Sequence, residues 1–134
     1  MRKASIGCAL AVMLGAIVPA FAHHSPAPFD RTREVTLKGT VKEFRWQNPH
    51  TWIEVNVPDG KGKVVLWGVE LTSPTYLIRA GWKSNTIKPG DQVTVIVNPI
   101  RTGEPAGIFR KLILADGREL TERPARLGGT PDSK

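Results

Sequence analysis

The chain has 134 residues, of which 40% are hydrophobic and 23% charged, with a formal net charge of +7 at pH 7. This length fits one domain with one core and leaves little room for a second domain. Internal repeats, low-complexity tracts and runs of five like charges are all absent from the sequence, which excludes a repeat architecture and a polybasic tail.

Residues 1–22 have the pattern of a secretory signal peptide. Arg2 and Lys3 precede an apolar run that ends at a proline, and Ala20-Phe21-Ala22 forms a small-x-small cleavage site. An uncleaved membrane anchor is the alternative. The apolar run is shorter than the roughly 20 residues that a membrane span needs, so we expect cleavage after Ala22.

Cleavage would make His23 the first residue of a periplasmic or secreted protein without a transmembrane segment. It would remove the only cysteine, Cys8, and with it any disulfide or thiolate site. The loss of Arg2 and Lys3 would lower the formal net charge from +7 to +5. A basic surface can bind nucleic acid. Because an exported protein is separated from nucleic acid, we expect no nucleic-acid partner. Weak attraction to anionic envelope polymers or lipids stays open.

A leader with two prolines, residues 23–33, precedes five expected strands and one short helix. In the leader we expect Phe29 to pack on the domain. The expected strands, from their alternating apolar residues and turn signals, are Glu34–Trp46, Thr51–Val57, Lys63–Leu71, Gln92–Val97 and Ile108–Leu114. The third has apolar residues on both faces, which predicts a central strand covered on both sides.

The first strand changes parity along its length. Leu37 and Val41 share one face, whereas Phe44 and Trp46 fall on the other. Such a switch predicts a bulge or sharp bend, which Gly39 would allow.

The short helix follows from its capping residues. Ser73 suits the N-cap, Pro74 the first helical position, and Gly81 the C′ position. Beyond residue 120 the apolar content falls, so residues 121–134 are expected to form a flexible tail.

The order strand-strand-strand-helix-strand-strand predicts an all-β fold with one short helix, a five-stranded OB-fold-like barrel over residues 34–120. The bent first strand favours this fold, because one strand must then serve both sheets. The helix would close one end of the barrel and place Tyr76, Leu77 and Ile78 against the core. An open five-stranded sandwich is the alternative.

A set of motifs spread over nearly the whole expected mature chain resembles a known family. The motifs are His23-His24-Ser25, Phe29-Asp30, Gly39-Thr40-Val41, Trp46-Gln47-Asn48-Pro49-His50, Trp67-Gly68-Val69-Glu70, Gly81-Trp82, Lys88-Pro89-Gly90-Asp91 and Asp116-Gly117-Arg118. Together they are similar to an uncharacterised family of small exported bacterial proteins, catalogued as a domain of unknown function. The resemblance implies a periplasmic or secreted location and transfers no activity.

The three histidines, His23, His24 and His50, are the candidate metal ligands. Cleavage would free the α-amino group of His23, and an amine beside imidazole rings suits Cu(II), which favours nitrogen donors in a tetragonal plane. His50 follows the Asn48-Pro49 turn and would add a nitrogen from the folded domain. The alternative is that the leader histidines form a frayed terminus and that His50 caps a turn. The sequence leaves the oligomeric state open.

A rival hypothesis assigns a non-metal ligand or envelope protein to the barrel face around Trp52, with Arg45 and Trp46 as further contacts. Trp52 is out of phase with Ile53 and the other apolar residues of its strand, so it is the best candidate for an exposed aromatic platform.

Catalysis is not expected. Glu54 and Glu70 could pair as acid and base, but ion pairs with basic residues are more common, and the sequence contains no hydrolase elbow, zinc-protease helix or phosphate loop. A redox enzyme built on the copper site is a distant third hypothesis. Trp67 and Trp82 are expected to fill the core.

Overall fold

The computed structural model describes residues 28–123. Its elements are β1 (Val35–Arg45), β2 (Trp52–Pro58), β3 (Val64–Glu70), α1 (Pro74–Arg79), β4 (Gln92–Pro99), β5 (Ala106–Leu114) and β6 (Glu119–Leu120). The five predicted strands and the helix are confirmed, and β6 is an addition. Within residues 28–123, no helix is both long and apolar enough to cross a membrane.

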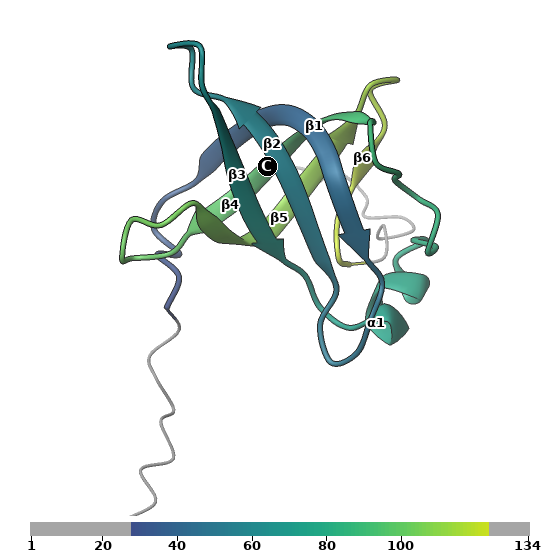
Figure 1. The fold of residues 1–134 in the computed structure, drawn as a ribbon. Helices are drawn as coiled ribbons and strands as arrows, with labels where there is room; N and C mark the ends of the chain where they lie inside the picture. The colour runs from purple at the N-terminus through teal and green to yellow at the C-terminus, as the bar shows by residue number, and fades with distance from the viewer. Residues whose placement is uncertain (1–27, 124–134) are drawn as a thin grey trace, which may run out of the picture.

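The strands form a closed barrel, as predicted. They follow the order β3-β2-β1-β4-β5-β6, and a parallel pairing of β3 with β5 joins the first to the fifth. The pairing aligns Gly68–Glu70 with Ala106–Ile108. This closure of five strands, with a helix between β3 and β4, is the OB-fold topology. Figure 1 shows β1, β2 and β3 on the near side, β4 and β5 behind them, and α1 at one end beside the β1–β2 turn.

The first strand serves both halves of the barrel. Its residues 35–40 pair with β4, and its residues 40–45 pair with β2. The register shifts between Val41 and Glu43, so Lys42 is the extra residue that moves the following side chains to the other parity. The predicted parity switch is therefore confirmed, but the bulge is at Lys42 and not at Gly39.

Gly39 has a different function in β1. A Cβ atom at this position would lie 2.2 Å from the backbone oxygen of Asn56 in β2, far inside van der Waals contact. Glycine is required here because two strands approach closely where β1 passes from one sheet to the other.

The core fills the inside of the barrel and extends to its α1 end. Its members, all at most 5% exposed, are Leu37, Val41, Ile53, Val55, Val69, Leu71, Leu77, Trp82, Ile87, Val93, Val95, Val97, Phe109 and Leu112. Trp82 packs edge-on against Phe109, with ring centroids 5.6 Å apart. The core assignment of Trp82 is confirmed, and Trp67 packs against the core from a partly buried position.

Two expectations about burial are wrong. Of the three helix residues expected in the core, only Leu77 reaches it, whereas Tyr76 and Ile78 are 58% and 60% exposed, because a helix of less than two turns turns one face inward. In β3 the outer residues Val64 and Leu66 are exposed. This strand is therefore covered on its inner face only.

The segments that flank the barrel are tied to it. Phe29 forms a β-bridge with Ile100, which confirms that the leader packs on the domain. At the other end, the indole Nε1 of Trp82 donates a hydrogen bond to the backbone oxygen of Thr121 at 2.8 Å. The predicted tail begins at residue 121, but contacts with the barrel continue beyond that point, so this boundary is too early.

Candidate functional site

The turn between β1 and β2 is pinned to the chain that follows β3. Thr51 is fully buried. Its backbone N–H donates to the oxygen of Thr72, and its own oxygen accepts from Leu71. These bonds extend the β2–β3 pairing past the end of both strands. They bring His50, which directly precedes Thr51, beside the end of β3, where Glu70 lies. The Asn48–Pro49 peptide in this turn is cis.

His50 and Glu70 form a hydrogen-bonded pair at the end of the barrel. The Nδ1 atom of His50 contacts the Oε1 atom of Glu70. An ionised carboxylate only accepts hydrogen bonds, so Nδ1 carries the proton and Nε2 is the other ring nitrogen. The His50 side chain is 52% exposed and that of Glu70 is 20% exposed. The pair therefore fixes the tautomer of a histidine that is open to solvent.

Glu122 lies close to this pair. Its Oε1 accepts a hydrogen bond from the backbone N–H of Thr72 at 2.5 Å. Burial raises the pKa of the Glu122 carboxyl above its ordinary value, and the negative charge of Glu70 acts in the same direction. The Thr72 bond, Arg110 and His50 lower that pKa. The end of the barrel thus combines one histidine and two carboxylates from three distant parts of the sequence.

This combination is not a complete metal site by itself. Among residues 28–123, no group of three or more His, Cys, Asp or Glu side chains has the arrangement to hold a metal ion. His23 and His24, the other ligands predicted from the sequence, lie outside the described residues. The structure therefore places one of the three predicted ligands and adds Glu70 as its partner.

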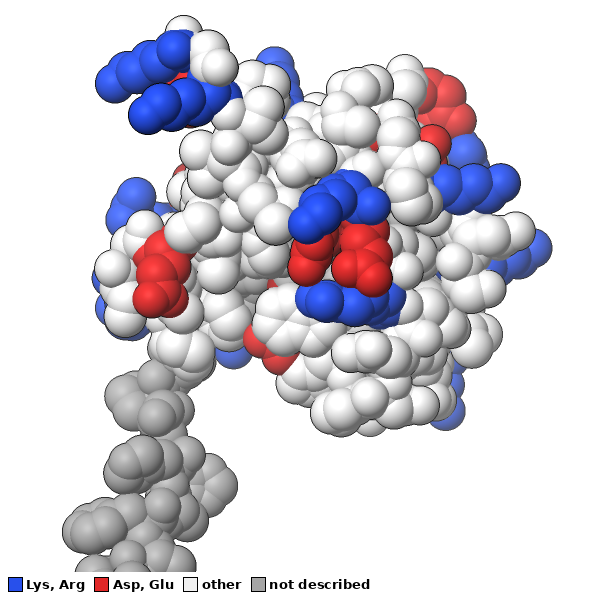
Figure 2. All heavy atoms as spheres, in the orientation of Figure 1, with Lys and Arg blue, Asp and Glu red and all other residues white. Residues whose placement is uncertain are grey.

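The rival face around Trp52 carries a network of ion pairs. The carboxylate of Glu54 lies 3.3 Å from Nζ of Lys42 and 3.4 Å from Nη2 of Arg45. Nη1 of Arg45 also lies 3.7 Å from the carboxylate of Glu43. In Figure 2, acidic side chains lie between basic groups in the middle of the visible face. The guanidinium of Arg45 is therefore engaged within the protein.

The aromatic side chains of this region separate into two groups. Trp52 is half-buried and is absent from the side chains that pack on the core. Trp46 packs edge-on against Phe44, with centroids 5.7 Å apart, and lines a hollow of about 350 Å³ with Trp82 and Ile78. Arg45 forms ion pairs and Trp46 packs on the core, whereas Trp52 belongs to neither set among the described contacts. Trp52 is therefore the best of the three candidates for contact with a ligand.

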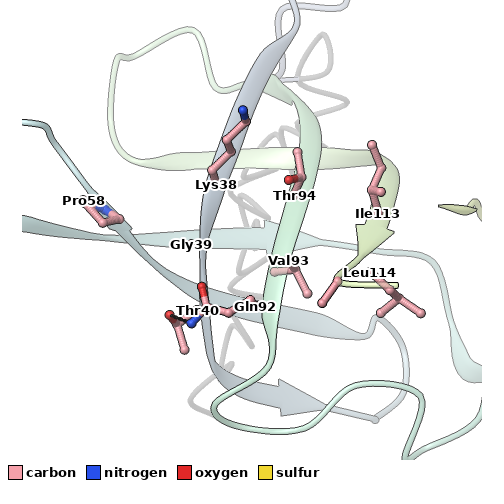
Figure 3. A pocket seen from close by; sticks show the side chains of 10 residues that line it. Lys38, Gly39, Thr40, Pro58, Gln92, Val93, Thr94, Ile113 and Leu114 are labelled. Atoms are coloured by element: carbon pink, nitrogen blue, oxygen red, sulfur yellow. Dashed lines mark hydrogen bonds between the residues drawn. The ribbon is translucent and has the colours of Figure 1, made fainter. Parts of the chain in front are cut away.

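Glu54 and Glu70 do not form an acid–base pair. Glu54 pairs with Lys42 and Arg45, which confirms the ion-pair interpretation for that residue. Glu70 contacts His50 instead of a basic lysine or arginine. A hollow of about 420 Å³ lies over β1, β4 and β5. Figure 3 shows Lys38 and Thr94 on adjacent strands there. Lys38 is the only ionisable residue in its lining.

Comparison with known proteins places the chain in a family. A family model described as "Family of unknown function (DUF6152)" matches residues 11–110. The chain belongs to this family. No curated protein matches the sequence.

Among solved structures, the mitochondrial single-stranded DNA binding protein Rim1 from S. cerevisiae is similar, with 10% sequence identity and a TM-score of 0.48. The match covers 62% of this chain and 93% of that chain. This similarity is too distant to bear on the ligand of the DUF6152 chain.

Proposed function

We propose that this DUF6152 protein is a small exported binding module that holds a copper ion between His50 and the leader histidines, His23 and His24. The observation that carries the proposal is the pairing of His50 with Glu70. A metal-binding histidine commonly donates its second ring N–H to a carboxylate, which orients the ring and raises the basicity of the ligating nitrogen. Here Glu70 occupies that position and Nε2 is the nitrogen that would bind.

The path of the leader supports a shared site. The backbone N–H of Asp30 donates to the oxygen of Pro99, and that of Arg101 donates to the oxygen of Pro28. The leader therefore meets the barrel at the end of β4. Asn98, near this end, and Glu70 both align with Ile108 in β5. Phe29 bridges Ile100 on the side of β4 away from β5, so three strand spacings, about 14 Å in all, separate the leader from β3.

This separation is within reach of the leader histidines. His24 precedes Phe29 by five residues, and five extended residues span about 17 Å. The imidazole of His24 and the amine and imidazole of His23 would supply nitrogens that the described residues lack. Nitrogen donors favour Cu(II) over Mg²⁺ or Ca²⁺, which prefer oxygen. The role would be sequestration or delivery, without catalysis.

Calorimetry on protein beginning at His23 tests the proposal. One equivalent of Cu(II) should bind with a nitrogen-rich electron paramagnetic resonance spectrum, and His50→Ala should weaken binding. A matched control is Asn48→Ala, which changes the same turn without removing a nitrogen ligand. Binding of Cu(II) that is equally tight in the parent and in His50→Ala would show that the barrel takes no part.

A second candidate is an envelope interaction module that uses the outer face around Trp52. What favours it is an aromatic side chain that is half-buried yet absent from the core contacts. A photo-crosslinking residue at position 52 tests it in the exporting cell, with exposed position 66 as the control. A specific adduct from position 52 alone would support this candidate. The same adducts from both positions would argue against it.

A further inference from the structure

A polar hollow on the outside of the barrel gathers arginines from distant parts of the chain. It has a volume of about 360 Å³, and its lining residues are Arg31, Asn98, Ile108, Phe109, Arg110, Glu122 and Arg123. The lining thus contains three arginines and one glutamate. The volume lies at the lower end of the range for small-molecule sites, about 300–1,000 Å³.

The leader wall of the hollow is held in place by specific bonds. Asp30 accepts hydrogen bonds from the backbone N–H and the hydroxyl of Thr32, which form a tight turn around Arg31. These bonds lower the pKa of the Asp30 carboxyl and keep it ionised. The side chain of Asn98, which is 3% exposed, donates to the oxygen of Arg33. Arg31 is therefore presented by a segment that is bound on both sides.

The opposite wall is fixed in the same way. Thr121 accepts a hydrogen bond from the Trp82 indole, and Glu122 accepts one from the Thr72 backbone. The hydroxyl of Thr121 donates to the oxygen of Arg123. Arg110 lines the hollow from β5. Its Nε is 3.7 Å from Glu34 in an exposed pair, which is too long for a strong hydrogen bond and leaves most of its donors available.

We propose that this hollow is a binding site for a small oxyanion, a carboxylate or phosphate compound, held by Arg31, Arg110 and Arg123. Arginine presents donors in a planar fork that matches both anions bidentately. Three positive groups outweigh the single Glu122 carboxylate in the lining. The proposed anion ligands differ from the copper ligands, since they include none of the three histidines, and Glu122 lies near both sets.

Glu122 opposes anion binding in the hollow when its carboxyl group is ionised. Its carboxylate is bound to Thr72 and cannot donate a hydrogen bond when ionised, so it repels an incoming anion. The substitution Glu122→Gln removes this charge and retains a carbonyl oxygen for the Thr72 N–H. It should therefore tighten oxyanion binding, whereas loss of an arginine should weaken it.

Calorimetry on metal-free protein tests the site, with inorganic phosphate and citrate as separate probes. Saturable binding of at least one probe is expected, with affinity reduced about tenfold or more in Arg31→Gln and Arg110→Gln and raised several-fold in Glu122→Gln. Tighter binding of citrate would identify a carboxylate ligand, and tighter binding of phosphate a phosphorylated one. Both arginines are exposed, so these variants should fold.

The matched control is Arg79→Gln on α1, which removes one exposed positive charge away from the hollow. It should leave the affinity unchanged. Equal weakening by all three arginine substitutions would show non-specific charge attraction and overturn the proposal. Failure of both probes to saturate would do the same, whatever the result with copper.

Discussion

His50 and Glu70 are 20 residues apart in the sequence and are joined by a hydrogen bond at one end of the barrel. If Glu70 orients a metal ligand, Glu70→Ala should lower Cu(II) affinity about 10- to 100-fold, as is typical when the partner of a ligating histidine is lost. Titration of the protein that begins at His23 measures this. Glu54→Ala is the control, since Glu54 pairs with Lys42 and Arg45. Equal losses in the two variants would contradict a specific function of Glu70.

Gly39→Ala should destabilise the barrel by about 2 kcal/mol or more, within the range for overpacked sites. The added Cβ would lie 2.2 Å from the Asn56 oxygen, which is backbone and cannot move aside cheaply. Gly68→Ala in β3 is the matched control, because nothing lies within 4 Å of its Cβ position. Urea denaturation of both variants checks the prediction, which fails if the two substitutions have similar costs.

Trp82 and Trp52 should differ in their contribution to the free energy of unfolding. Trp82 is 1% exposed in the core, so Trp82→Ala should cost about 3–5 kcal/mol in the free energy of unfolding. Trp52 is only half-buried on the outer face, and Trp52→Ala should cost clearly less. Chemical denaturation of the two variants compares them. A cost of roughly 3 kcal/mol or more for Trp52→Ala would place that residue in the core.

Stability should depend on the ionisation of Glu122. Its pKa is raised in the folded protein, chiefly by burial. The protonated form therefore favours folding below the ordinary glutamate pKa, near 4.5. That contribution is lost as the pH rises through the raised folded-state pKa. The melting temperature of Glu122→Gln should thus improve relative to the parent as the pH increases through this window. A constant difference between the two proteins would show that Glu122 does not titrate differently on folding.

Much of the fold could be predicted from local pattern. The alternation in the strands, the Ser73-Pro74 helix start and the parity switch of β1 are all properties of neighbouring residues. The bulge was predicted at Gly39 because glycine tolerates a bend, although Leu37 and Val41 share a parity, which already places the shift after Val41. The two-residue strand β6 is too short to give a periodic signal.

The candidate site was harder to predict from the local sequence pattern. His50 could be selected because histidines are rare in this chain, but its partner depends on how β3 returns beside the β1–β2 turn. The bond between Thr72 and Glu122 joins residues 50 positions apart, and the arginines of the oxyanion hollow come from three separate segments. These contacts arise from barrel closure, which composition and spacing do not encode.

In the proposed copper site, the barrel and the leader bind one copper ion together. The most direct measurement is the Cu(II) affinity, at fixed pH and salt, of three proteins: the parent that begins at His23, His50→Ala, and a form with one extra residue before His23. We expect both changes to lower the Cu(II) affinity. Acidification should lower the Cu(II) affinity of the parent as well, because its nitrogen ligands must be unprotonated. Equal affinity in all three proteins would contradict the site. Weakening by the extension alone would reduce it to a local chelate of the leader, without the barrel.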